Sequence, residues 1–222
     1  MTSDRLTARE RIIREAMRLF SQKGYKRTSV ADIQAAAGLA PGSGALYKHF
    51  ASKEEVLRAG LQPYIAEAQR ARSQLHAVKI APAEALSAMA HQTLDILATR
   101  QNELRIFWRD LEQFPKIQVK VRREIMQDSY RALSDWLRDR AVQGEIRRHD
   151  SDAVAAVLLG SLTMFKVFEA LWGEKTIPVN DQRFHRAWCD LMLTGLGLQA
   201  QATDADAPTE GPARGTARSK KR

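Results

Sequence analysis

The segment 28–50 contains two helix starts separated by a glycine turn. Ser29 can cap the first helix, and Asp32, three residues later, can return a hydrogen bond to the backbone of the cap. Gly38 suits the position just past the end of this helix, because glycine adopts a left-handed backbone without steric cost. Pro41 is tolerated in the first turn of a following helix, where its missing amide proton has no partner in any case. This spacing predicts a helix-turn-helix.

The second helix of the pair is expected to bury Leu46 and Phe50, which stand one turn apart. The three residues between them, Tyr47, Lys48 and His49, then point outward. A phenol, an ammonium and an imidazole can all donate hydrogen bonds to phosphate oxygens. The pattern therefore predicts a surface that binds DNA phosphates. The plainer interpretation is that Tyr47 and His49 only pack against the first helix.

Over residues 6–57 the chain resembles the DNA-binding domain of the tetracycline-repressor (TetR) family of bacterial regulators. The resemblance rests on pieces that stand in the family's order: Phe20 with Gly24-Tyr25, Thr28 to Ile33, Ala37-Gly38, Leu46-Tyr47 with His49-Phe50, and Ser52-Lys53-Glu54. An ordered set of this kind is far more specific than one short motif. The chain departs from the commonest pattern by two additional residues between Gly38 and Leu46, which affects where the recognition helix starts.

The resemblance implies that Tyr47, His49 and Lys53 contact backbone phosphates. The complete set of candidate DNA-binding residues is Thr28, Ser29, Gln34, Ser43, Gly44, Ala45, Tyr47, Lys48, His49 and Lys53.

Base reading is expected to be modest, because the segment 42–45 that should enter the major groove has short side chains. Ser43 can hydrogen-bond a base edge and Ala45 can touch a thymine methyl group, but no Arg or Asn is available there for bidentate contacts. We therefore expect specificity to depend on Gln34, on Arg5 in the N-terminal arm and on DNA shape.

Positive charge is densest around this motif. Residues 1–58 have 11 Lys and Arg against 6 Asp and Glu, whereas residues 59–200 have 19 against 17. Such an excess is typical of a phosphate-binding surface, although many surface helices are mildly basic without binding anything.

The fold class is expected to be all-α, because apolar residues recur at helical spacing and no stretch alternates with a period of two. Residues 1–52 should form a three-helix DNA-binding domain and residues 53–200 a helical effector-binding and dimerisation domain, with about nine helices in total. The predicted helices after the motif are 53–75, 82–97, 102–114, 115–142, 151–172 and 181–198. Pro63 lies inside the first of these and predicts a kink or a break near Leu61. Residues 201–222 lack large hydrophobic side chains and predict a disordered basic tail. It either solubilises the chain or adds weak attraction to DNA.

The last two predicted helices suggest a homodimer, because 153–165 is apolar on nearly every face. In the family that the chain resembles, these two helices form a four-helix dimer bundle. The candidate interface residues are Val154, Val157, Leu158, Phe184, Trp188, Leu191 and Met192. The alternative is that 153–165 is only a central core helix.

The resemblance also implies a small-molecule pocket among the middle helices. Candidate ligand-binding residues are Phe107, Trp108, Asp110, Trp136, Phe165 and Phe168. Aromatic residues at this spacing are also typical of an ordinary core.

Other classes of protein find little support. The sequence has no His-Glu-x-x-His, no phosphate-binding loop and no nucleophile elbow, and its five histidines are scattered, so we expect neither an enzyme nor a metal or cofactor site. A single cysteine, Cys189, and no apolar stretch of membrane-spanning length predict a cytoplasmic protein without a membrane partner. We expect a dimeric repressor that binds a palindromic DNA operator and is released by an apolar or amphipathic effector. The alternative is an effector-independent DNA-binding protein.

Overall fold

The computed structural model describes residues 6–77, 79–173 and 177–198, and over these ranges the chain is helical with no strand, which confirms the all-α prediction. Nine α-helices lie within this part of the chain. They are α1 (Ala8–Lys23), α2 (Val30–Ala36), α3 (Lys53–Ala77), α4 (Pro82–Thr99), α5 (Gln101–Arg109), α6 (Pro115–Val121), α7 (Asp128–Val142), α8 (Ser151–Trp172) and α9 (Asp181–Gly195). The expected tail at 201–222 and the arm residue Arg5 lie outside the described residues.

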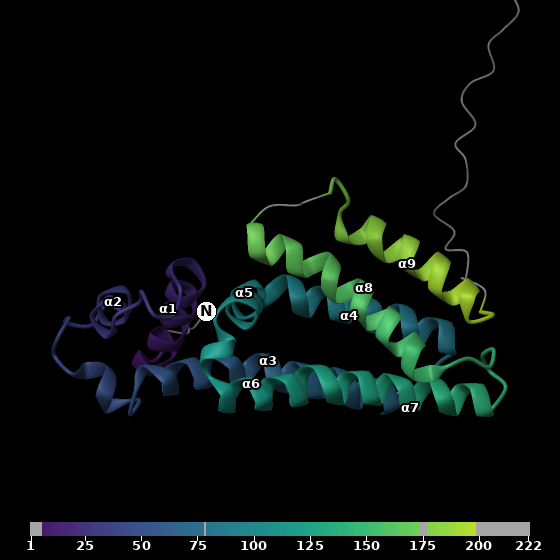
Figure 1. Ribbon diagram of the computed structural model, residues 1–222, viewed down its shortest axis with the longest axis horizontal. Helices are drawn as coiled ribbons and strands as arrows, with labels where there is room; N and C mark the ends of the chain where they lie inside the picture. Colours follow the sequence, from purple (N-terminus) through teal and green to yellow (C-terminus); the bar gives the residue numbers. More distant parts are fainter. Residues whose placement is uncertain (1–5, 78, 174–176, 199–222) are drawn as a thin grey trace, which may run out of the picture.

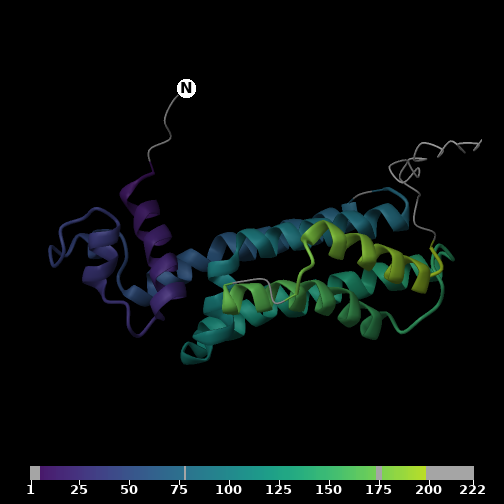
Figure 2. The same cartoon turned by 90° about the horizontal axis from the view of Figure 1, so that it is seen from above.

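The molecule is elongated (Figure 1). Helices α1 and α2 lie together at one end, which we call the head, and α4 to α9 form the body at the other. The long helix α3 starts in the head and runs along the body beside α6 and α7, as the view from above also shows (Figure 2). It continues without a break through Pro63, where the sequence predicted a kink or a break.

Capping boxes begin both head helices. Thr7 and Glu10 exchange hydrogen bonds at the start of α1, and Ser29 and Asp32 do so at the start of α2. The cap predicted for Ser29 is thus confirmed, and it satisfies amide groups that would otherwise lack partners.

The second motif helix is much shorter than the sequence predicted. Residues 41–44 form turns, and only Ala45–Lys48 are helical, as one 3-10 turn. The physical reason is the pair of glycines in the additional residues: Gly42 has φ +74° and Gly44 has φ +69°. Both angles lie in the left-handed region, which a right-handed helix cannot include.

The middle of the chain also differs in detail from the predicted helices. The helix predicted at 102–114 ends at Arg109 and is followed by a 3-10 turn, Leu111–Gln113. The helix predicted at 115–142 is α6 and α7 joined by a π-helical segment, Arg122–Gln127. Within a helix, π segments are uncommon and often stand at functional sites.

One hydrophobic core joins the head to the body. Ile12, Phe20 and Leu57 pack in the same cluster as Ile106 of α5 and Ile117 of α6. A second core lies farther along the body, between α4, α7, α8 and α9. Because the first core crosses the expected domain boundary at residues 52 and 53, movements of the head are mechanically tied to α5 and α6.

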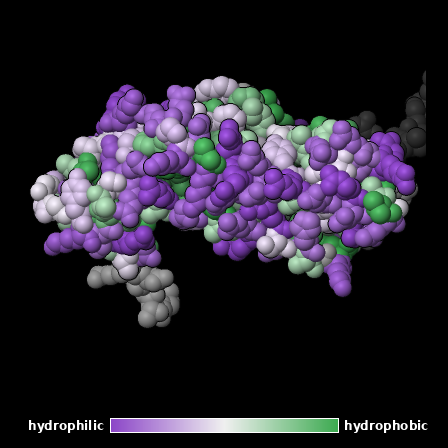
Figure 3. All heavy atoms as spheres, turned by 60° about the horizontal axis from the view of Figure 1, so that its bottom comes forward, coloured by the Kyte–Doolittle hydropathy of each residue, from purple (hydrophilic) through white to green (hydrophobic). Residues whose placement is uncertain are grey.

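Helix α8 is the one helix in the described part of the chain that is long and apolar enough to cross a membrane by length and composition. It packs in the body against α4, α5 and α7. Its Lys166 is buried and forms ion pairs with Glu169 and with Asp181 of α9. The face in Figure 3 is predominantly hydrophilic, with small scattered apolar areas.

Candidate DNA-binding surface and effector cavity

Three polar side chains project from the 3-10 turn of the head. Leu46 and Phe50 are buried and anchor the turn on the head core, so the residues between them face solvent. Tyr47 is 57% exposed, and Lys48 and His49 are exposed as well. The structure thus brings together the three residues that the sequence placed on an outward face. Their side chains are free to reach an approaching phosphate.

Ser29 and Ser43 are also exposed, but the structure engages both hydroxyl groups. Ser29 Oγ accepts from the amide of Asp32 at 3.0 Å. Ser43 Oγ donates to Ala40 O at 2.6 Å and accepts from the amide of Ala45 at 3.3 Å. Donation from Ser43 to a base therefore requires exchange of its hydrogen bond to Ala40, whereas one acceptor position on Oγ remains. Gly44 and Ala45 are half-buried beside it.

Two of the candidate DNA-binding residues lie inside the head, contrary to expectation. Thr28 is fully buried and its Oγ1 donates to Gly24 O at 2.9 Å. Gln34 is 1% exposed, and its Oε1 accepts from the amide of Gly42 at 3.2 Å. The expectation that Gln34 reads bases does not fit this burial. Instead, the amide side chain fixes the glycine-containing loop, a role that its position in the sequence did not reveal.

Lys53 is held by the head's own backbone. Its Nζ donates to Tyr25 O at 3.0 Å and to Thr28 O at 2.7 Å, and it lies 4.1 Å from the centroid of the Tyr25 ring. Burial lowers the pKa of Lys53. Because an ammonium has three N–H groups, one remains for a phosphate. Lys53 therefore has a structural role in fixing the backbone at Tyr25 and Thr28, in addition to the phosphate contact that the resemblance implies.

A cavity of about 130 Å³ lies in the body between α3, α4, α5, α7 and α8. Phe107 and Trp108 of α5 line it, in agreement with the sequence-based expectation. Most of the other lining was not foreseen; it includes Tyr64 and Arg72 of α3, Met89 and Ile96 of α4, Ile125 of the π segment and Tyr130 of α7. These residues come from helices far apart in the sequence, and no periodic pattern connects them.

The other four candidate ligand-binding residues do not line this cavity. Trp136 is buried in the second core. Asp110 is buried and bonds Arg109, with Arg109 Nη2 to Asp110 Oδ2 at 2.9 Å. Phe165 and Phe168 line a separate depression of about 300 Å³ between α8 and the start of α9. Their side chains face away from the cavity because they project from a different side of α8.

The candidate dimer residues divide between the core and the surface. Leu158 and Trp188 are buried within the chain, and Trp188 Nε1 donates to Ser161 Oγ at 3.0 Å. Val157 and Leu191 are 57% and 71% exposed. Val154, Phe184 and Met192 are half-buried. With Val157, the residues Met164, Phe168 and Trp172 give α8 an exposed apolar face.

Helix α5 is fixed to both the head and α8 by arginines. Arg109 donates from Nη2 to Phe20 O at 2.6 Å and from Nη1 to Ser21 O at 3.0 Å, near the end of α1. Arg105 Nε donates to Ala170 O at 2.5 Å, near the end of α8. A cation at these positions adds a hydrogen bond to carbonyls near the C-terminus of each helix and complements the helix dipole. The cavity wall is thus connected directly to the head.

These features define the class of helix-turn-helix DNA-binding regulators with a helical second domain. Family models agree over most of the body and head: bacterial regulatory proteins of the tetR family match residues 12–59, and the tetracyclin repressor-like C-terminal domain matches residues 79–166. The chain belongs to the TetR family and is a DNA-binding transcriptional regulator. The prediction from the motif is therefore confirmed at this level.

Similar proteins are found by sequence and by structure. The uncharacterized HTH-type transcriptional regulator YerO of Bacillus subtilis is 40% identical over 57 residues, which cover 26% of this chain and only 19% of that relative. The solved regulator PfmR from Thermus thermophilus is 28% identical, with a TM-score of 0.64 over 84% of this chain and 98% of that one. The regulator FadR from Bacillus subtilis, solved in complex with stearoyl-CoA, is 20% identical, with a TM-score of 0.65 over 83% of this chain and 97% of that one. At that identity the likeness to FadR shows the fold alone.

Among the described residues no group of three or more His, Cys, Asp and Glu side chains is arranged to hold a metal ion.

Proposed function

We propose that this regulator is a repressor that binds a palindromic operator as a homodimer and leaves it when a small apolar or amphipathic effector fills the body cavity. The observation that carries the DNA-binding part is the outward group Tyr47, Lys48 and His49, held in place by buried Leu46 and Phe50. The proposed division is a DNA-binding domain at 1–52 and an effector and dimerisation domain at 53–200. We further propose a soluble cytoplasmic protein without enzymatic activity or cofactor.

The proposed dimer is supported by the apolar face of α8 and by Leu191 of α9. Exposed apolar residues at helical spacing present surface whose burial stabilises association. A single head with short side chains in its recognition segment presents little base-reading surface, so two heads on one operator would compensate. Changing Leu191 to Glu should convert the dimer to a monomer in sedimentation velocity, and a dimer that persists would place the interface elsewhere.

The proposed effector is supported by the cavity and by its position. Phe107 and Trp108 line the cavity, and the next residue, Arg109, holds the end of α1. Occupancy that displaces α5 would therefore move the head. The structural neighbour FadR was solved with stearoyl-CoA, so the same fold accommodates a ligand with a long apolar chain.

The phosphate contacts can be tested once genomic fragments that bind the protein have been selected. Lys48→Gln should weaken binding to operator and random DNA alike, and should lower the slope of log affinity against log salt by about 0.9 for each phosphate that a subunit no longer neutralises. Arg131→Gln is the matched control, since it removes the same charge from an exposed position on α7 far from the head. Equal slopes for Lys48→Gln and the unmodified protein would remove Lys48 from the proposed surface.

A further inference from the structure

The lining of the body cavity contains one charged side chain, Arg72, among the residues that the structure describes. Within the same part of the chain, no Asp or Glu side chain lines the cavity. The remaining polar groups are neutral: the hydroxyls of Tyr64, Thr93, Ser129, Tyr130 and Thr163 and the indole of Trp108. The charge of the lining thus favours an anion over a cation.

Arg72 is only partly satisfied by the protein. Its Nη1 donates to Glu124 O at 2.7 Å and to Ser129 Oγ at 3.2 Å, and within the described ranges it forms no ion pair. Arg100 offers a direct contrast, because the same guanidinium group there pairs with both Glu67 and Glu103. A guanidinium without a carboxylate partner is available to a ligand anion, and the charge-assisted hydrogen bonds it would form are stronger than neutral ones.

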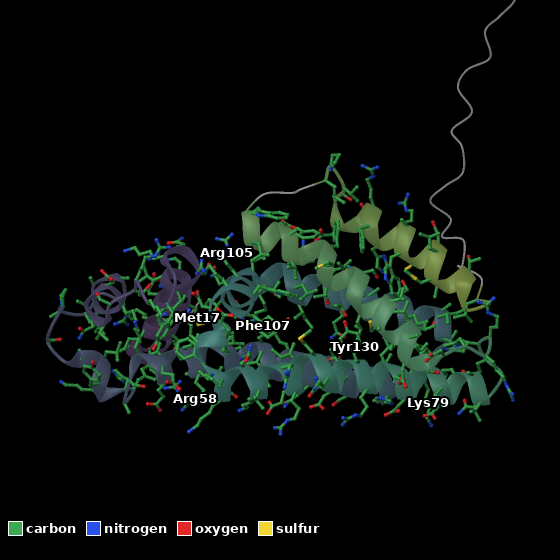
Figure 4. The ribbon with its side chains drawn as sticks, viewed as in Figure 1. Met17, Arg58, Lys79, Arg105, Phe107 and Tyr130 are labelled. Atoms are coloured by element: carbon green, nitrogen blue, oxygen red, sulfur yellow. The ribbon has the colours of Figure 1, made fainter. Side chains whose placement is uncertain are left out.

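The contact with Glu124 places Arg72 at the π segment of the cavity wall. Glu124 belongs to Arg122–Gln127, and the neighbouring Ile125 and Met126 line the cavity. Both hydrogen bonds from Arg72 use Nη1, so an anion can bind the Nε and Nη2 side of the guanidinium while the contact with Glu124 remains. Figure 4 shows Phe107 and Tyr130, from α5 and α7, in the space between the two layers of body helices, where the apolar part of such a ligand would lie.

We propose that the effector is an amphipathic anion whose carboxylate or phosphate monoester binds the Arg72 guanidinium, while its apolar part fills the cavity. This inference rests on the proposed effector role of the cavity. An engineered cavity of about 150 Å³ accepts benzene, so the space here holds about as much as a single ring, and the rest of a longer chain would extend to solvent past Trp108, which is 44% exposed. The parallel N–H groups of the Arg72 guanidinium, its fork of donors, match the two oxygens of a carboxylate and the oxygens of a phosphate.

The test compares probes with one eight-carbon chain and different head groups: octanoate, octyl phosphate, 1-octanol and octylammonium. Binding to the full-length protein is measured by isothermal titration calorimetry, and the part of the tryptophan fluorescence change that is lost in Trp108→Phe reports arrival in the cavity. At least one anion should bind roughly tenfold or more tightly than 1-octanol, because charge-assisted hydrogen bonds are the stronger ones. Octylammonium should bind most weakly. Comparing octanoate with octyl phosphate shows whether the cavity prefers a carboxylate or a phosphate.

Variants assign the preference to Arg72. Arg72→Gln should remove the advantage of the anion over 1-octanol and leave the affinity for 1-octanol within about threefold. Arg72→Lys, which keeps the charge but not the fork, should give an intermediate advantage. Arg70→Gln is the matched control, since Arg70 lies on the same helix with an exposed side chain and is not part of the lining. Thermal unfolding of each variant confirms that it is folded.

The proposal is overturned if 1-octanol or octylammonium binds as tightly as both anions, if the anion advantage survives Arg72→Gln, or if none of the probes binds. Operator binding is followed by fluorescence anisotropy in the same samples. If 1-octanol binds best and releases DNA, the ligand-responsive function stands and only the anionic class is wrong. If the anions bind in the cavity without affecting operator binding, the class stands and the release by an effector is wrong.

Discussion

The two faces of α5 differ in packing. On one face Ile106 is fully buried in the core that joins head and body. On the other, Trp108 lines the cavity and is 44% exposed. Phe107 lies between the two faces, since it lines the cavity and also packs against the core of Ile106. A close-packed contact transmits displacement, whereas a cavity allows it. The difference shows how a helix of only nine residues can respond to a ligand on one face and move the head with the other.

The largest expected effect comes from the packed face. Ile106→Ala should lower the free energy of unfolding by roughly 2–5 kcal/mol, because it leaves a void between head and body. Ile96→Ala, on the cavity wall, should cost less, since Ile96 already lacks packing partners on its cavity side. Urea unfolding monitored by circular dichroism measures both. Equal losses would show that the two faces do not differ as described.

The link from α5 to the head should give the next largest effect. Arg109→Gln removes charge-assisted hydrogen bonds to the end of α1 and leaves buried Asp110 without its cation, at a cost of roughly 1.5–3 kcal/mol. Amide hydrogen exchange should then accelerate at the end of α1, where Gly24 N donates to Phe20 O. Arg58→Gln is the control, because its exposed pair with Glu54 should contribute no more than about 0.5 kcal/mol. Unchanged amide hydrogen exchange in α1 would mean that the hydrogen bonds from Arg109 do not stabilise the end of that helix.

Close packing of α1 on α3 depends on Gly60. An added Cβ there would lie 2.3 Å from Met17 Sδ and 2.5 Å from its Cγ. Gly60→Ala gains about 1 kcal/mol in helix propensity but costs about 1–3 kcal/mol through overpacking, so a net loss of up to about 2 kcal/mol is expected.

A double mutant gives the sharper measurement of this contact. In a Met17→Ala background the obstruction is gone, so Gly60→Ala should become stabilising in thermal unfolding. A stabilising effect in both backgrounds would show that the Met17 side chain moves aside at little cost. A destabilising effect in both would show that Met17 is not the obstruction.

Local patterns predicted the head better than the body. The cap at Ser29, the buried pair Leu46 and Phe50 and the exposed Tyr47 follow from residues within a few positions of one another, and the structure agrees with each. The short recognition turn was missed because Gly42 was interpreted as part of a helix. Its positive φ is compatible with a turn and not with that helix.

The cavity could not be located from local patterns, because its lining is set by tertiary packing. Trp136 and Phe165 stand at helical spacing, as Phe107 does. Trp136 nevertheless lies in the second core, and Phe165 lines the separate depression between α8 and the start of α9. Arg72 carried no signal in the sequence, since an arginine on a polar helix face is ordinary. Only the convergence of α3 with the π segment shows that it lines the cavity.

The smallest expected effect concerns the attachment of α5 at its other end, where Arg100 Nε donates to Glu67 Oε2 of α3 at 2.8 Å. The hydrogen bond from Arg100 lowers the pKa of Glu67. A carboxylate with a lowered pKa stabilises the fold fully above its unfolded pKa, and this contribution is lost as pH falls through the lower, folded value. Burial raises the pKa of neighbouring Glu103, so its effect on the pH dependence of stability has the opposite sign.

Glu67→Gln isolates the first of these two groups. The unmodified protein should exceed the variant in free energy of unfolding by about 1 kcal/mol or less near neutral pH, since the pair is partly exposed. The difference should shrink below pH 4.5, the ordinary pKa of a glutamate, as Glu67 becomes protonated. Glu112→Gln, at an exposed position, is the matched control. A Glu67 difference that is independent of pH would mean that α5 is held at this end by packing and not by the ion pair, leaving Arg105 and Arg109 as its polar attachments.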